Sequence, residues 1–206
     1  MEMIYNPFAI PFLEKHPEIE IFNIMDDSLL SETLKEGTIT SAVAGRILNY
    51  VYSAERAGAD AVMVTCTSVN EAAKYARRFS KIPVFNIDEP VAKIAIDAGS
   101  RIGVLATLPT SPKATIRLLN EEAQRINKKI DVIPFVVEGA FDILVSGDRK
   151  KHDEMVADAL YKLAQKVDVI TFAQISMSLV PHEDCGKPIF KIGESGFEEA
   201  RRLMRL

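Results

Sequence analysis

The sequence has little that would attract nucleic acid or an anionic membrane surface. Its 25 lysine and arginine residues are outnumbered by 29 aspartate and glutamate residues, which gives a formal net charge of −4. It has no basic run, no tryptophan and three histidines. Because both partners are bound mainly through positive charge, we expect neither a nucleic-acid partner nor a membrane partner.

Cysteine is equally scarce. The two cysteines, Cys66 and Cys185, belong to no CxxC motif and to no Cys/His cluster, so a structural zinc site is not expected. Two isolated thiols are typical of a reducing compartment, which predicts a cytoplasmic protein. The start, MEMIYNPFAIPF, lacks the basic and apolar regions of a signal peptide, and no apolar stretch reaches transmembrane length.

Motifs for common cofactors are also missing. The chain contains no P-loop, no GxGxxG fingerprint and no lysine in a recognisable Schiff-base setting. We therefore expect no nucleotide, no pyridoxal cofactor and no metal. What the sequence does contain is an ordinary globular balance of 48% hydrophobic and 26% charged residues over 206 positions, enough for one domain or two small ones.

Strand-like runs alternate with segments of helical spacing along most of the chain. Strands are predicted at 2–5, 18–25, 60–66, 82–87, 101–107, 130–137, 168–173 and 188–192. Helices are predicted between them, among them 41–57, 91–99, 153–166 and a closing amphipathic helix over 194–206. The stretches 26–40 and 138–152 are expected to be irregular. This alternation predicts an α/β fold with parallel sheets and right-handed crossovers.

The segment ADAVMVTCTSVNEAA, residues 59–73, is the strongest candidate site. A continuous apolar run predicts a central strand buried on both faces, and it ends in Cys66, Thr67 and Ser68 where a helix begins. In open α/β sheets, ligands bind at the carboxyl ends of the strands. A second interpretation is that Cys66 is a small buried hydrophobe and that the two hydroxyls cap the helix.

The two halves of the chain repeat each other. The strand from Asp60 to Cys66 matches the one from Asp168 to Gln174, and the strand PVFNI answers PIFKI further on. EIEIFNI likewise answers IDVIPFV. A period of half the chain indicates duplicated lobes, predicted at 1–96 and 97–193 with the helix 194–206 packing back on the first. Cys66 and Gln174 are then expected to face each other across a cleft.

Five segments in order carry a resemblance to a known family: GADAVMVTCTSVNEA, IPVFNIDEP, RIGVLATLPT, VEGAFDILVSGD with the following His152-Asp153, and DVITFAQISM. Together they resemble the aspartate/glutamate racemase superfamily. The resemblance implies two pseudo-symmetric lobes, each a small parallel sheet flanked by helices, and a homodimer. It also implies cofactor-free chemistry at the carbon next to the carboxylate of a small amino acid or related acid. Typical members place one cysteine in each lobe; Cys66 matches the first, and Gln174 replaces the second.

The residue types fit this chemistry. A cysteine at a strand end leading into a helix has the setting that favours a thiolate, which could act as base or nucleophile. Thr67 and Ser68, with the N–H groups of the new helix, are predicted to bind a carboxylate. Further donors are expected in the second lobe, although each could instead be a cap or turn residue: Thr107, Thr110 and Ser176.

Gln174 cannot transfer a proton at neutral pH, so a symmetric two-thiol racemisation is not available. Three possibilities follow. Cys66 works with another group such as Glu138, whose place in VEGAF resembles a cleft-lining position of the family. Alternatively, Cys66 acts alone, in protonation after decarboxylation or in an addition that permits cis–trans rotation. The third possibility is a protein that only binds its carboxylate ligand.

The other polar candidates have bland interpretations. Asp26 and Asp27 either line the cleft or close a turn. In the pair His152-Asp153, a helix cap at Asp153 is favoured over catalysis. His182 and Cys185 share the polar loop PHEDCGK and are expected to be solvated.

Overall fold

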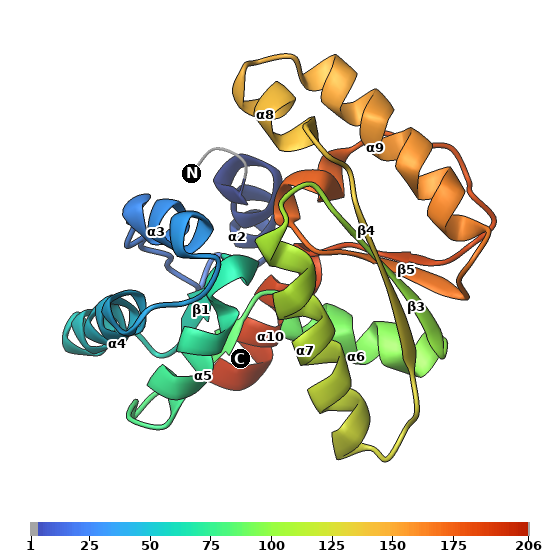
Figure 1. The fold of residues 1–206 in the computed structure, drawn as a ribbon. Helices are drawn as coiled ribbons and strands as arrows, with labels where there is room; N and C mark the ends of the chain where they lie inside the picture. Colours follow the sequence, from blue (N-terminus) through green and yellow to red (C-terminus); the bar gives the residue numbers. More distant parts are fainter. Residues whose placement is uncertain (1–3, 206) are drawn as a thin grey trace. The chain divides into compact units, whose positions relative to one another are not determined.

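A computed structural model describes residues 4–205 (Figure 1). The chain forms two compact units. The first runs to Ile87 and takes up the chain again from Gly193, and the second spans Asp88–Ile192. The helix that follows the last strand of each half therefore belongs to the other unit.

The first unit is built on a parallel pair of short strands, β1 (Val62–Val64) and β2 (Val84–Asn86). Its helical elements are η1 (Tyr5–Ala9), α2 (Ile10–Lys15), α3 (Ser28–Glu36), α4 (Ser41–Arg56), η2 (Thr67–Val69), α5 (Asn70–Arg77) and α10 (Glu194–Met204). The side chains of β1 are only half-buried, whereas those of β2 are buried. The expectation of a strand buried on both faces was wrong.

Helix α4 forms because its apolar residues recur along one face and its first turn is capped. Thr40 accepts a hydrogen bond from the N–H of Val43 at 3.1 Å. The buried side chains are Val43, Ile47, Val51 and Ala54. The first three of them pack against Val69 and the alanines of α5, forming the core of the first unit.

Helix α10 approaches the end of β2 closely at one glycine. A Cβ atom on Gly196 would stand 2.5 Å from the Cγ1 atom of Ile87 and 3.1 Å from its carbonyl oxygen. The ring centroid of Phe197 in the same helix lies 5.4 Å from that of Phe12 in α2, with the two rings tilted by 44°. The C-terminal helix is thus packed into the first unit by its close approach at Gly196 and by an aromatic pair.

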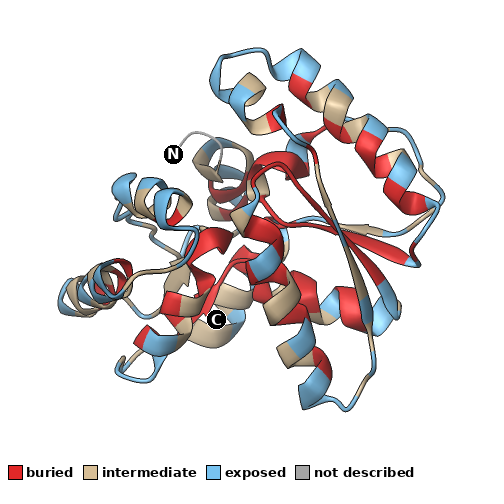
Figure 2. Cartoon of the chain, in the orientation of Figure 1, coloured by how far each residue is buried: buried red, intermediate tan, exposed pale blue. Residues whose placement is uncertain are grey.

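The second unit carries a four-stranded parallel sheet in the order β4-β3-β5-β6. The strands are β3 (Arg101–Ala106), β4 (Asp131–Val136), β5 (Val169–Phe172) and β6 (Ile189–Phe190). The helical elements are α6 (Glu89–Ala98), α7 (Thr110–Arg125), α8 (Ala140–Val145), α9 (Arg149–Ala164) and η3 (Ile175–Leu179). Figure 2 shows the buried centre of this sheet, and β5 is buried throughout. Separate apolar clusters cover its two faces.

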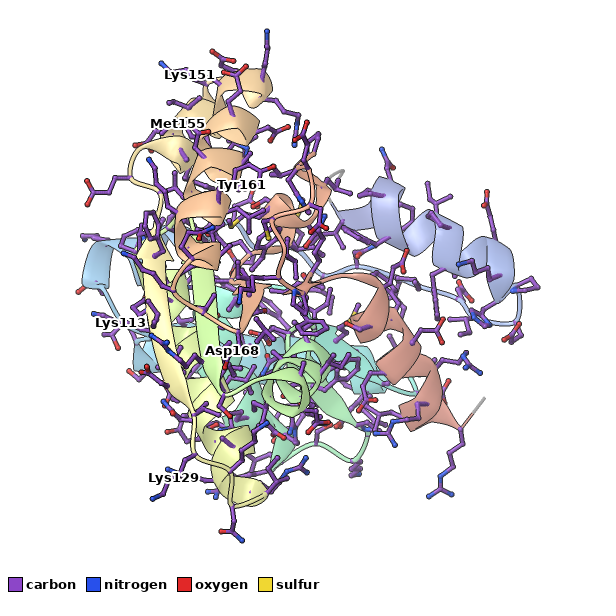
Figure 3. The ribbon with its side chains drawn as sticks, turned by 90° about the vertical axis from the view of Figure 1, so that its right-hand side faces the viewer. Lys113, Lys129, Lys151, Met155, Tyr161 and Asp168 are labelled. Carbon is purple, nitrogen blue, oxygen red and sulfur yellow. The ribbon has the colours of Figure 1, made fainter. Side chains whose placement is uncertain are left out.

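Asp168, labelled in Figure 3, ties the starts of β5 and β3 together. Its carboxylate accepts the N–H of Arg101 at 2.8 Å and the N–H of Ser100 at 3.2 Å. These two backbone donors hold the pKa of Asp168 below its ordinary value. The charge that opens the repeat strand therefore has a structural role.

The sequence repeat extends to strand register. Val62 is opposite Val84 in the first sheet, and Ile170 is opposite Ile189 in the second, at the matching positions of the repeat. The turns match as well. The N–H of Val69 donates to the carbonyl of Cys66 at 3.1 Å, and the N–H of Met177 donates to the carbonyl of Gln174 at 3.2 Å. Cys66 and Gln174 are therefore structural equivalents within their units.

The alternating segment 18–25 forms no strand, in contrast to the sequence prediction, and the chain has no regular structure there. The similar segment IDVIPFV does form β4, because β3 lies beside it to complete the hydrogen bonds. The first predicted strand, 2–5, lies partly outside the described residues, and Tyr5 already starts η1. The stretches expected to be irregular contain α3 and α8.

Candidate active site

Cys66 stands at the turn between β1 and α5. It is extended, with φ −108° and ψ 109°, and η2 begins at the next residue. The thiol side chain is half-buried and packs at the border of the first unit's core. The two hydroxyl residues that follow are buried, Thr67 at 6% and Ser68 at 7% exposure. The predicted group of one thiol and two hydroxyls is therefore gathered in one turn.

Two buried asparagines are joined by a hydrogen bond next to this turn. The side-chain amide of Asn86, at the end of β2, donates to the carbonyl of Asn70, the first residue of α5, at 3.0 Å. Their exposed fractions are 1% and 2%. Neither residue was predicted from the sequence, although an asparagine inside the apolar strand IPVFNI was a detectable signal. The bond ties the end of β2 to the start of α5 next to the Cys66 turn.

Gln174 occupies the matching turn of the second unit and is 9% exposed. Its side-chain oxygen accepts hydrogen bonds from the N–H groups of Thr107 at 2.6 Å and Leu108 at 3.2 Å, and from the Thr107 hydroxyl at 3.2 Å. The amide oxygen must face these donors, since an amide nitrogen could not accept from a backbone N–H. Thr107 was expected to donate to a substrate carboxylate; in this structure its hydroxyl donates to Gln174.

The other predicted residues of the second unit follow its strand ends. Thr110 opens α7 and is half-buried, and Ser176 lies in η3 at 8% exposure. Glu138 is exposed just after β4, beside Gly139, whose φ is 75°. Because β3, β4 and β5 are parallel, these residues share the carboxyl edge of one sheet with Gln174.

Helix α7 also carries two buried hydroxyls that sequence analysis did not single out. Ser111 and Thr115 are 1% and 4% exposed, and within the described part of the chain their hydroxyl oxygens have no hydrogen-bond partner. They are one helical turn apart and so share a face of α7. Buried polar groups without partners are uncommon, which makes this helix face an unusual feature of the second unit.

Asp26 has a structural role. Its carboxylate accepts from the N–H of Ser28 at 3.0 Å and from the Tyr50 hydroxyl at 2.7 Å, and it pairs with Arg46 at 3.1 Å. Hydrogen bonds from the side chains of Ser28 and Tyr50 hold the pKa of Asp26 below its ordinary value. The bond to Asp26 raises the pKa of Tyr50. Asp27 is exposed and makes no side-chain cap.

The remaining predictions need two corrections. Asp153 does not cap α9; Asp148 does, by accepting the N–H of Lys151 at 3.1 Å. His152 is fully buried, with Nδ1 2.7 Å from an Asp153 oxygen. The loop residues His182 and Cys185 are half-buried, and Cys185 packs against the core of the second unit.

Within 4–205, no group of three or more His, Cys, Asp and Glu side chains could hold a metal ion. No helix in that part of the chain has both the length and the apolar character to cross a bilayer.

Several solved structures have a fold similar to that of this chain. A glutamate racemase isoform from Bacillus anthracis superposes with a TM-score of 0.71 at 16% identity, over 96% of this chain and 76% of that one. An aspartate racemase homologue from Pyrococcus horikoshii gives 0.66 at 14% identity, over 96% and 94%. A mutant of arylmalonate decarboxylase gives 0.56 at 16% identity, over 80% and 76%. These likenesses show the fold.

A search of curated protein sequences finds no significant match. The family model of the Asp/Glu/hydantoin racemases, in contrast, matches residues 10–200, nearly the whole chain. The protein is therefore a member of the Asp/Glu/hydantoin racemase family.

Proposed function

We propose that the protein is a cofactor-independent isomerase of a small amino acid or related carboxylic acid, and that it works through the thiolate of Cys66. The observation that carries the proposal is the Cys66 turn. It combines a half-buried thiol with two buried hydroxyl residues at the start of a helical segment. Membership of the racemase family supports the reaction class.

The chemistry follows from these groups. The Cys66 thiolate removes the proton from the carbon beside the carboxylate, and the electron pair of the broken C–H bond moves into the carboxylate to form an enediolate. The Thr67 and Ser68 hydroxyls, with the N–H groups of the turn, are the proposed donors to the enediolate oxygens. Returning the proton from the thiol to the same carbon completes a cycle of exchange.

Inversion requires a second proton donor. Gln174 does not supply it, because an amide has no acidic proton at neutral pH and its oxygen already accepts from Thr107 and Leu108. Glu138 is the proposed second group. The variant Glu138→Gln should then keep Cys66-dependent hydrogen exchange while losing inversion.

The second candidate is a lyase. It is favoured because the proposed site contains one thiol, that of Cys66. In a decarboxylation, carbon dioxide leaves the substrate and the remaining enediolate takes one proton, so one thiol is enough. The likeness of the fold to arylmalonate decarboxylase, at a TM-score of 0.56, is compatible with this one-cysteine lyase.

Deuterated water separates the candidates. The protein is incubated with a panel of amino acids, substituted malonates, maleate and hydantoins, and deuterium uptake, optical rotation and carbon dioxide are followed. Exchange with loss of chirality supports the isomerase, and carbon dioxide release supports the lyase. Cys66→Ser is compared with Cys185→Ser as the matched control. Silence across the panel, with carboxylate binding that survives Cys66→Ser, would make the protein a binder only.

A further inference from the structure

Helix α3 buries little of its surface in the first unit. Of its nine residues, all of which the structure describes, Thr33 alone is buried, and its hydroxyl donates to the Leu29 carbonyl within the same helix at 2.8 Å. Leu29, Leu30 and Leu34 are half-buried. A nine-residue helix with so little burial is not stable alone, so other contacts must hold it.

Arg46 of α4 supplies several of those contacts, beside a hydrogen bond that the Thr40 hydroxyl donates to Glu32. One nitrogen of its guanidinium lies 2.6 Å from a Glu32 carboxylate oxygen in the middle of α3, and the other lies 3.1 Å from Asp26, just before the helix. The second nitrogen also donates to the Ser28 hydroxyl. Tyr50, one turn further along α4, bonds the same Asp26 oxygen at 2.7 Å. The planar fork of Arg46 thus grips α3 at two points.

What α3 lies against is the Cys66 turn. The helix is in contact with η2, the turn of Thr67–Val69 that begins directly after Cys66. Leu29 of α3 and Cys66 itself pack against the same apolar cluster, which includes Val43 and Val69. Release of α3 would therefore remove a neighbour of Thr67–Val69 and of the apolar cluster on which Cys66 packs.

The chain on both sides of α3 can accommodate such a movement. Residues 18–26 before it have no regular structure. Gly37, which ends it, has φ +66° and nothing within 4 Å of the position of a Cβ atom. An irregular segment and a left-handed glycine therefore flank a helix with little buried surface.

We propose that α3 is a lid over the Cys66 turn, that Arg46 latches it closed, and that Arg46 is therefore a positioning residue for the thiol site. The ion pairs are partly exposed, with side-chain exposures of 30% for Arg46, 31% for Glu32 and 14% for Asp26. Such pairs are weak enough to open on the timescale of ligand entry. The proposal goes beyond the proposed function, because it concerns access to Cys66 and not the reaction.

Alkylation of Cys66 by iodoacetamide tests the lid without any need for turnover. In a Cys185→Ser background, Arg46→Gln should raise the alkylation rate by about fivefold, the factor that a partly exposed ion pair can supply. Loss of a nearby positive charge would by itself disfavour the thiolate and slow the reaction, so an increase reports access. Arg56→Gln, on the same helix α4, is the matched control and should leave the rate unchanged.

Two further measurements guard against a folding artefact. Amide hydrogen exchange in Arg46→Gln should speed up in α3 while α4 keeps its protection. In the parent protein, raising the salt to about 1 M should also speed alkylation, because ions screen the latch, and Arg46→Gln should lose that response. Equal alkylation rates in Arg46→Gln and Arg56→Gln, or uniform loss of protection across α4, would overturn the lid.

Discussion

Gln174 gives the sharpest prediction about how the second unit is held together. Replacing it by leucine keeps the size of the side chain and removes the oxygen that accepts the N–H groups of Thr107 and Leu108. Both donors lie in buried residues, at 4% and 8% exposure. Each stranded N–H costs about 1–3 kcal/mol, and the extra apolar surface of leucine offsets roughly 1 kcal/mol, so we expect Gln174→Leu to lose about 3 kcal/mol of stability.

Urea unfolding followed by far-ultraviolet circular dichroism measures this loss. Gln124→Leu, an exposed position in α7, is the matched control and should change stability by less than about 0.5 kcal/mol. Gln174→Glu should lose less than Gln174→Leu, because a carboxylate can accept from the same donors. If Gln174→Leu were as stable as the Gln124→Leu control, the side-chain oxygen would not be what holds the Thr107 turn.

Three other predictions follow from the packing and the shifted carboxylates. The bond to Asp26 raises the pKa of Tyr50, so a spectrophotometric titration should show Tyr50 ionising above the usual range for tyrosine, and Asp26→Asn should lower its pKa again. Backbone N–H groups lower the pKa of Asp168 in the folded protein. The ionised carboxylate therefore contributes its full stability above pH about 4, and this contribution disappears as the pH falls through the lowered pKa of the folded state. Asp168→Asn should lose stability at pH 7, and its stability should converge with that of the parent protein in acid. Gly196→Ala should destabilise through the 2.5 Å contact with Ile87, whereas Gly45→Ala, with nothing within 4 Å, should stabilise α4 by up to about 1 kcal/mol in thermal unfolding.

The repeat was the part of the fold that sequence could predict. Matching Asp60–Cys66 with Asp168–Gln174 also predicts which residues are equivalent in the sheets, and the registers of Val62 with Val84 and of Ile170 with Ile189 agree. The sequence pattern recurs because each of the two units contains the same strand and turn geometry. The position of Cys66 after a strand was predictable from the residues next to it in the sequence.

What escaped prediction depends on contacts between distant segments. The alternation of 18–25 resembles that of β4, but whether a segment becomes a strand depends on a partner that its own sequence does not encode. The hydrogen bonds that Gln174 accepts from Thr107 join residues far apart in the chain, and no sequence motif predicts them. The latch between Arg46 and α3 is a pairing of the same kind.

The central claim is that Cys66 is the reactive group, and hydrogen exchange at the substrate carbon tests it most directly. In deuterated water, with whichever acid of the panel exchanges, the account predicts that Cys185→Ser retains the exchange rate of the parent protein. Cys66→Ser should abolish it while still binding the acid. Undiminished exchange in Cys66→Ser would contradict this claim, whatever the rate of Cys185→Ser.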